Sequence, residues 1–273
     1  MKEKLFYVAA FVAVVLAFCS CSSIQRVINS GDAELIYERG ILYYNAEKWQ
    51  KAIALLDHCE PYFKDTYKAD TIAFYKARSY FKDRDYMTAS EKFDEFRRSF
   101  GRSAFIEDAE GMYALCYYYM SPSPERDQTV TTQAIIAITE FMSRYPESKD
   151  IDAFNEMLTT LSNRLMEKSY LNAYTYYKIG RYKAAIVAFK NAMKNYPDSP
   201  YIEDIMYYIT VSAYRLAENS VESKQLDRYI AMLDHYYSYL AEYPESKRLR
   251  ELERMARDAR NFIDKNRRTE DGL

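Results

Sequence analysis

The sequence contains few of the residues that build catalytic and metal sites: two histidines, four cysteines and one tryptophan among 273 residues. His58 and His235 each stand alone within an expected helix, without the clustered partners that a metal site or a catalytic pair needs. No glycine-rich phosphate loop, nucleophile elbow or zinc-protease motif occurs. We therefore expect no catalytic residue, no metal site, and a protein that is not an enzyme. An active site hidden in inserted loops is the alternative, and no pair of nucleophile and base supports it.

Glycine and proline are also scarce, at 6 and 7 residues, while hydrophobic residues make up 49% of the chain. This balance favours long helices joined by short turns over a β-rich domain. A surplus of charge of one sign is missing as well, because the net charge is −2 and acids and bases are interspersed along the chain. We therefore expect no basic face and no nucleic acid partner.

The chain begins with the pattern of a secretion signal. Lys2 and Lys4 precede an apolar run over residues 5–18 that is too short to span a bilayer comfortably. Residues 16–21 then resemble a bacterial lipobox, in which a small residue precedes the cysteine that receives a diacylglyceryl group. The prediction is a lipoprotein signal peptide over residues 1–20.

Cys21 is the expected lipid attachment site, and this covalent lipid is the only cofactor that we expect. A short flexible tether over residues 21–31 would follow it, and Ser22 favours the outer membrane over retention in the inner membrane. An ordinary signal peptide with a stray cysteine is the alternative. Cys59 and Cys116 stand among apolar neighbours at helical spacing, so we expect buried free thiols there.

A repeated phrase marks the ends of helices. Tyr145-Pro146-Glu147-Ser148, Tyr196-Pro197-Asp198-Ser199 and Tyr243-Pro244-Glu245-Ser246 follow one another at intervals of 51 and 47 residues. Each closes a run with helical apolar periodicity. Proline cannot continue a helix, and an acid followed by serine favours a turn and the start of the next helix.

Within each unit a second pattern resembles the tetratricopeptide repeat. Small residues recur at fixed offsets between large rings, and they allow two antiparallel helices to approach closely. These small residues are Gly40, Ala52, Ala77, Ala89, Ala173 and Ala185.

The predicted fold is all-α, a tetratricopeptide-repeat superhelix of about five helical hairpins over residues 32–266. It has an inserted loop over residues 121–127, a polar insertion near residues 219–224 and a capping helix over residues 247–266. A flexible tail over residues 267–273 would follow.

By the same resemblance, the first helix of each hairpin lines a concave binding face. The side chains that would face a bound peptide are Tyr37, Ile41, Tyr44, Phe74, Arg78, Phe81, Tyr118, Tyr119, Tyr170, Tyr174, Tyr177, Tyr208 and Arg215. An aromatic groove with a few guanidinium groups suits an extended peptide, because rings contact it at low entropic cost and arginine binds carboxylates in a bidentate way. The alternative for any one tyrosine is packing between neighbouring repeats.

The lipobox, the five repeats and the chain length together resemble the BamD family, the lipoprotein subunit of the outer-membrane β-barrel assembly machinery. The resemblance is strongest from Glu125-Arg126-Asp127 through Ala134 and Phe141 to the first Tyr-Pro corner, and from Leu161 through Tyr174 to the second.

This resemblance implies a scaffold that is lipid-anchored to the outer membrane and faces the periplasm. Its C-terminal repeats would bind the barrel-forming subunit of the assembly machinery, and its N-terminal repeats would bind unfolded outer-membrane protein precursors. A periplasmic tetratricopeptide lipoprotein that coordinates cell-wall or secretion machinery is the alternative.

Overall fold

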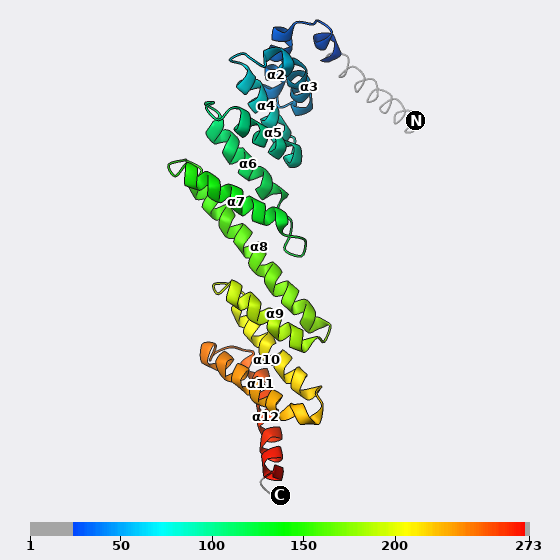
Figure 1. Ribbon diagram of the computed structural model, residues 1–273, viewed down its shortest axis with the longest axis vertical. Coiled ribbons are helices and arrows are strands. Elements are labelled where there is room, and N and C mark those ends of the chain that lie inside the picture. Colours follow the sequence, from blue (N-terminus) through cyan, green and yellow to red (C-terminus); the bar gives the residue numbers. More distant parts are fainter. Residues whose placement is uncertain (1–23, 271–273) are drawn as a thin grey trace, which may run out of the picture. The chain divides into compact units, whose positions relative to one another are not determined.

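The computed structural model describes residues 24–270, and every regular element in that range is a helix. Five antiparallel helical hairpins follow one another along the chain (Figure 1). The first helices are α2 (Ala33–Asn45), α4 (Ala69–Lys82), α6 (Ile106–Met120), α8 (Ile151–Lys178) and α10 (Ile202–Glu218); the second helices are α3 (Trp49–Cys59), α5 (Tyr86–Ser99), α7 (Thr129–Arg144), α9 (Tyr182–Asn195) and α11 (Glu222–Glu242). A final helix, α12 (Leu249–Glu270), follows the fifth hairpin. The predicted fold class of tetratricopeptide-type hairpins with a C-terminal helix is confirmed.

The chain forms two compact units, each with its own core. The described part of the N-terminal unit contains hairpins 1 to 3 and the first turns of α8, up to Leu158. The C-terminal unit contains residues 122–128, the rest of α8 from Thr159, and α9 to α12. A ring-rich cluster around Phe74, Phe93 and Phe96 fills the N-terminal unit between α4, α5 and α6. Hairpin 5 and α12 enclose a second core around Met232, Tyr239 and Leu252.

Three hairpins turn with the same backbone geometry. The residue in the middle of each turn, Glu47, Arg84 or Gly180, has a positive φ between 56° and 71°. The next residue donates its N–H to the carbonyl of a recurring tyrosine in the preceding helix, which is Tyr43 in hairpin 1, Tyr80 in hairpin 2 and Tyr176 in hairpin 4. These bonds satisfy carbonyl groups that the helix end leaves open. The recurring tyrosines of the sequence pattern therefore mark where each first helix ends.

The three Tyr-Pro corners end second helices as predicted. The corner tyrosine follows the last residue of α7, α9 or α11, and the serine three positions later donates its N–H to the tyrosine carbonyl. That serine's own carbonyl accepts the N–H at the start of the next helix. The same geometry occurs at residues 63–66 and 100–103, where no proline is present. The bonds across the corner, rather than the proline, therefore define this connection.

Small residues lie where the two helices of a hairpin approach each other. Ala52, Ala77, Ala89 and Ala185 have no exposed surface. A Cβ atom on Gly40 of α2 would lie 2.9 Å from Cδ2 of Leu56 on α3. Only glycine therefore fits at this position without moving a buried leucine.

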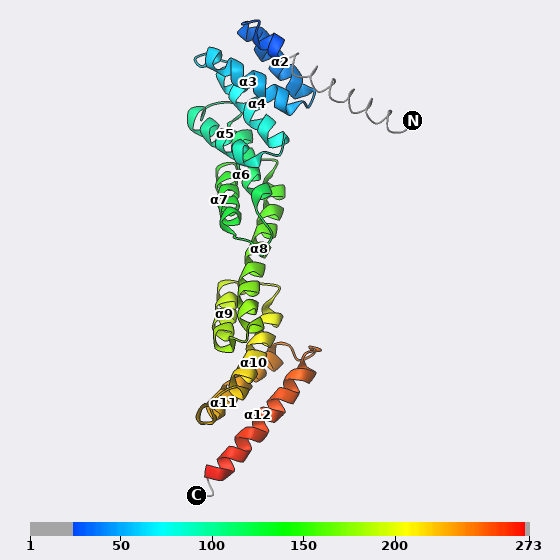
Figure 2. The ribbon, with the colours of Figure 1, turned by 90° about the vertical axis from the view of Figure 1, so that its right-hand side faces the viewer.

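Near the end of the chain, the last two helices have different bounds from those predicted. The predicted polar insertion near residues 219–224 is a turn of residues 219–221, because α11 begins at Glu222. The predicted tail is helical over residues 267–270, since α12 continues to Glu270. Leu252, Met255 and Ala259 of α12 are buried against hairpin 5, and Figure 2 shows α12 beside α11. The helix covers the apolar face of the last repeat, which is the capping role expected of it.

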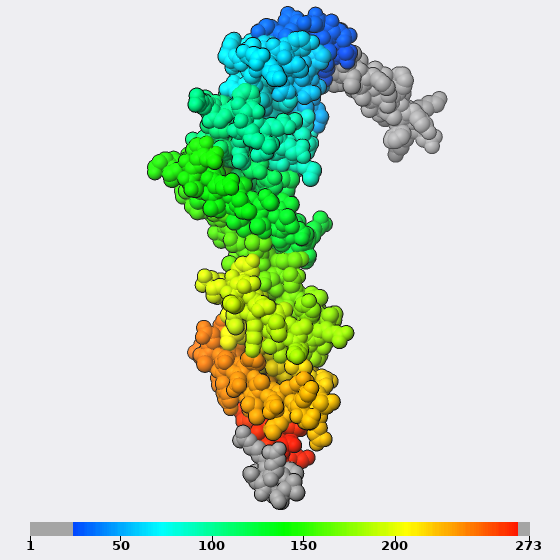
Figure 3. All heavy atoms as spheres, viewed as in Figure 1, coloured from blue at the N-terminus to red at the C-terminus, as the bar shows by residue number. Residues whose placement is uncertain are grey.

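The predicted flexible tether is structured over residues 24–28, which is a correction to the expectation from sequence. These residues form a short helix, and Ile24, Val27 and Ile28 pack against the core of hairpin 1. The dark-blue atoms of this segment lie against the light-blue atoms of hairpin 1 in Figure 3. Three apolar side chains at helical spacing bury enough surface to order the segment. Cys21 and the predicted signal peptide lie outside the described residues.

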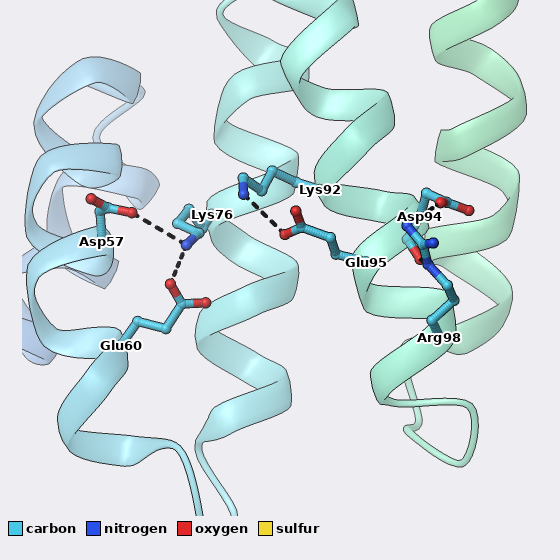
Figure 4. A network of polar contacts seen from close by, with 7 residues as sticks. All are labelled: Asp57, Glu60, Lys76, Lys92, Asp94, Glu95 and Arg98. Carbon is cyan, nitrogen blue, oxygen red and sulfur yellow. Dashed lines mark hydrogen bonds and ion pairs between the residues drawn. The ribbon is translucent and has the colours of Figure 1, made fainter.

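A buried ammonium group joins hairpins 1 and 2. The side chain of Lys76 on α4 is 5% exposed, and its Nζ forms ion pairs with Asp57 of α3 and with Glu60 in the 3₁₀ turn η1 (Glu60–Phe63) (Figure 4). Nζ of Lys76 lies 3.3 Å from Oδ1 of Asp57. Because a buried charge needs an opposite charge, this contact sets how the two hairpins align.

Candidate functional site

All the side chains predicted to face a peptide lie on the first helices of their hairpins. Within the N-terminal unit, however, most of them contact other rings. Tyr44 of α2 contacts Tyr75 of α4 edge to face, with ring centroids 4.7 Å apart. Ile41 packs against the core of hairpin 1, and the ring of Tyr37 lies 5.8 Å from that of Phe63. These rings join neighbouring hairpins and are partly buried.

The structure corrects the prediction that Phe74 faces a bound peptide. Its side chain is 1% exposed and stacks on Phe105 at 4.6 Å, with Phe93 and Phe96 also in contact. A side chain enclosed in this way stabilises the core and offers almost no surface to a peptide. Its helical position matched the repeat pattern, but the sequence did not reveal that Phe105 would cover it.

Three other predicted positions form an exposed ring cluster. Phe81 of α4 contacts Tyr119 of α6 at 5.8 Å, and Tyr119 stacks on Tyr86 of α5 at 5.0 Å. Tyr118 adjoins Tyr119 at 5.5 Å. Tyr119 is 52% exposed, so this cluster presents aromatic surface to solvent.

Beside this cluster lies a pocket of about 350 Å³ between α4, α6 and α8, which we call the α4–α6–α8 pocket. It lies wholly within the N-terminal unit, and first helices of three successive hairpins contribute to it. Its walls are Phe74, Arg78, Glu107, Asp108, Gly111, Met112, Leu115, Tyr119, Phe141, Lys149, Asp150, Ala153, Phe154 and Met157.

Arg78 is the polar side chain of this pocket with an unmet hydrogen-bonding group. Its Nε is buried and has no hydrogen-bond partner among the described residues. Its guanidinium carbon lies 5.9 Å from the centroid of the Phe74 ring. Lys149 adds a second cation to the lining, while Glu107, Asp108 and Asp150 add three acids. A guanidinium with an open hydrogen-bonding group is suited to bind a carboxylate.

The tyrosines of the C-terminal unit form a continuous stack. Tyr170, Tyr174 and Tyr177 follow one another on α8 at 5.8 Å spacing, and Tyr208 of α10 lies 4.9 Å from Tyr174. Burial raises the pKa of Tyr170 to about 12 and also raises that of Tyr177. Desolvation disfavours the phenolate. The predicted side chains are therefore brought together here, half-buried between α8, α9 and α10. Arg215 remains exposed at the end of α10 and pairs with Glu218.

A second groove, which the sequence analysis did not predict, follows α9. This α9 groove has a volume of about 960 Å³, and Tyr176, Val187 and Leu216 form apolar parts of its wall. Tyr176 is 45% exposed and Val187 is 55% exposed. The further wall residues are Gly180, Arg181, Tyr182, Lys183, Ala184, Ala188, Asn191 and Asn219.

The surroundings of the α9 groove are basic, which corrects the expectation that the chain has no basic face. No acid occurs between Glu167 and Asp198, whereas six cations do: Lys168, Lys178, Arg181, Lys183, Lys190 and Lys194. The last five of these are exposed. The net charge of the whole chain does not reveal this stretch without acids. Counting acids in windows of 30 residues would have found it.

Comparison with known proteins agrees with the resemblance. Residues 29–228 match the family described as YfiO, outer membrane lipoprotein. The outer membrane protein assembly factor BamD of Caulobacter vibrioides is 22% identical over 226 residues, which are 80% of this chain and 72% of the relative. The protein of the same name in Pasteurella multocida is 27% identical over 128 residues, which are 42% of this chain and 48% of the relative.

The tetratricopeptide domain of yeast Sti1, solved as a complex with an Hsp90 peptide, is similar at a TM-score of 0.40 and 13% identity. That likeness covers 83% of this chain and 98% of the Sti1 chain. It is too distant to carry an argument, and the fold rests on the hairpins described above.

Within residues 24–270, no helix combines the length and the apolar character that crossing a bilayer requires. The family match extends over most of the chain and includes all five hairpins except the last part of α11. The predicted resemblance to the BamD family is confirmed, and the chain belongs to the YfiO family of outer membrane lipoproteins.

Proposed function

We propose that this protein is a lipid-anchored, periplasm-facing scaffold of the outer-membrane β-barrel assembly machinery. Lipid on Cys21 would hold it at the outer membrane, and it would bind both unfolded barrel precursors and the barrel-forming subunit. This role needs no catalytic chemistry, so the protein acts as a binding scaffold rather than an enzyme. The observation that carries the proposal is the α4–α6–α8 pocket, a cavity with both polar and apolar walls and a buried guanidinium nitrogen that has no hydrogen-bond partner among the described residues.

The α4–α6–α8 pocket would receive the C-terminal segment of an unfolded barrel precursor. Met112, Leu115 and Met157 offer apolar wall to an aromatic side chain of the peptide. Arg78 and Lys149 offer charge to its terminal carboxylate. A peptide that ends in a ring and a carboxylate would therefore make two contacts. The ring would pack against the apolar wall, and the carboxylate would accept a hydrogen bond from Nε of Arg78.

The α9 groove would bind the barrel-forming subunit, and we expect an acidic, partly apolar surface on that partner. Lys183 and Lys190 flank the exposed Val187 on α9. Opposite charges guide association and fix register, while the apolar side chains supply the buried area. Separate surfaces on the two units would allow both partners to bind one chain.

The peptide proposal is tested by fluorescence anisotropy with a labelled peptide from the C-terminus of a barrel protein. Arg78→Met should weaken binding about tenfold, since a charged hydrogen bond contributes about 1.5–3 kcal/mol. Amidation of the peptide carboxylate should cause a similar loss in the wild type and little further loss in the variant. Arg215→Met is the matched control, because Arg215 is exposed and lies in the other unit. Equal binding of acid and amide peptides would contradict the role of Arg78.

The partner proposal is tested by purification from membranes. Lys183→Glu with Lys190→Glu should abolish recovery of the barrel-forming subunit, whereas Lys247→Glu, an exposed lysine at the third Tyr-Pro corner, should leave it unchanged. Depletion of the protein should lower several outer-membrane barrel proteins at once. Normal barrel levels, or recovery of cell-wall or secretion components instead, would favour the alternative function.

A further inference from the structure

The first described residues are fixed to one end of hairpin 1. Ile24, Val27 and Ile28 pack against a core that includes Leu56 and Phe63. Asp32 then caps α2 by accepting the N–H groups of the second and third residues of that helix. The path of the chain from residue 24 to α2 is therefore set by packing and capping.

The connection between hairpins 1 and 2, residues 60–68, lies at the same end. Lys68 forms an ion pair with Glu34 in the first turn of α2. The ammonium group of Lys68 also lies over three rings, 4.7 Å from the centroid of Tyr37, 5.3 Å from that of Phe63 and 5.7 Å from that of Tyr67. These contacts hold the connection against the start of α2.

This connection exposes aromatic surface. Tyr67 is 86% exposed and Tyr62 is 63% exposed, which are high values in a protein whose other tyrosines are mostly half-buried. Pro61 and Lys64 between and beside them are exposed as well. Tyrosine and lysine together are typical of the layer where a bilayer meets water, because the ring enters the headgroup region while the hydroxyl and ammonium groups stay hydrated.

The length of chain before this end limits its distance from a membrane. Two residues, Ser22 and Ser23, lie between Cys21 and Ile24. The three steps along the chain allow at most about 11 Å between the Cα atoms of Cys21 and Ile24. The polar layer of a bilayer is roughly 5–7 Å thick on each side. A lipid on Cys21 would thus keep the end of hairpin 1 within reach of the headgroups.

We infer that residues 61–67 form a membrane-contacting corner, with the rings of Tyr62 and Tyr67 in the headgroup layer of a phospholipid bilayer. This inference rests on the lipid anchor of the proposed function. The rings orient hairpin 1 at the surface, whereas the lipid supplies the affinity.

The test uses the lipidated protein in phosphatidylethanolamine and phosphatidylglycerol vesicles with brominated acyl chains. In a Trp49→Phe background, tryptophan is introduced by Tyr67→Trp or, as a control, by Met87→Trp. Met87 is 68% exposed and lies at the opposite end of hairpin 2, about 20 Å away along α4. We expect blue-shifted emission and bromine quenching for Tyr67→Trp and an aqueous spectrum for Met87→Trp. An aqueous Tyr67→Trp spectrum, or equal quenching of both, overturns the inference.

Hydroxyl-radical footprinting of the unsubstituted protein removes any bias from the added tryptophan. Labelling of Tyr62 and Tyr67 in the vesicle-bound protein should be several-fold lower than in Cys21→Ala protein in solution without detergent. Labelling of Tyr119 should be the same in both samples. Unchanged labelling of Tyr62 and Tyr67 overturns the inference. Mass spectrometry reports the lipid on Cys21 separately, so an unlipidated protein contradicts the anchor, whereas an unprotected corner on a lipidated protein contradicts the membrane contact alone.

Discussion

Among single residues, Lys76 is a buried charge whose partners are exposed. Its ammonium group is buried, whereas the side chains of Asp57 and Glu60 are 67% and 40% exposed. Removing the lysine leaves two acids that water can solvate. Removing the acids leaves a buried cation without a partner, which is much less favourable.

This asymmetry gives a prediction for a mutant cycle. Asp57→Asn with Glu60→Gln should lower the free energy of unfolding by about 3 kcal/mol, because the Lys76 charge becomes uncompensated. Adding Lys76→Met to that variant should restore most of the loss. Urea denaturation of the four proteins measures both effects. A Lys76→Met protein as unstable as the double variant would contradict this account.

The buried thiols predict how stability depends on pH. Burial raises the pKa of Cys59 and Cys116, each to about 12, from an ordinary value of 9.0. Between these values the unfolded chain releases its thiol protons while the folded chain keeps them, so unfolding becomes easier as pH rises. This contribution is complete below pH 9 and is lost towards pH 12.

The expected result is a Tm that falls from pH 9 upwards by differential scanning fluorimetry. Burial raises the pKa of Tyr113 and Tyr170 to about 12, so they add to the fall above pH 10. Cys116→Ala should make the fall shallower, and the same slope in that variant would contradict the role of the thiol.

At the scale of elements, each hairpin depends on close contact between its two helices. Gly40 shows the limit of that contact, since its position leaves no room for a methyl group beside Leu56. Gly101 is a useful comparison. It lies in an exposed corner, where the nearest atom to an added Cβ would be the carbonyl oxygen of Arg97 at 3.7 Å.

Gly40→Ala should therefore destabilise the protein by about 1 kcal/mol, because an overpacking cost of about 1–3 kcal/mol exceeds the gain of roughly 1 kcal/mol from replacing a helical glycine. Gly101→Ala should change stability by less than about 0.5 kcal/mol. Thermal and urea unfolding would test both variants. An increase in stability for Gly40→Ala would show that the helices of hairpin 1 can separate without cost.

At the scale of the whole molecule, the proposed membrane attachment depends on Cys21, which lies outside the described range. Cys21→Ala should release the processed protein from the membrane fraction, because the lipid proposed on Cys21 would supply the affinity for the membrane. Fractionation followed by immunoblotting measures this, with Cys59→Ala as the control. Continued membrane association of processed Cys21→Ala protein would show that another contact anchors it.

Local pattern was sufficient to predict the architecture. The Tyr-Pro corners, the recurring tyrosines and the small residues at Gly40 and Ala185 each act within one hairpin, so their spacing alone located the helices. The candidate site was predicted only in part. The helices that carry it were correct, but Phe74 is a core residue, and neither the α9 groove nor the structured residues 24–28 was anticipated.

The sequence by itself therefore determined the helices, their pairing and the family, because those depend on periodicity and on residues near one another in the chain. Only the tertiary structure decided which rings are covered and which remain open. Phe74 and Tyr119 both lie on the first helix of a hairpin, yet Phe105 covers the first, and the second stays exposed. Coverage of a side chain depends on residues from another hairpin, and their approach is set by packing between repeats that no local pattern records.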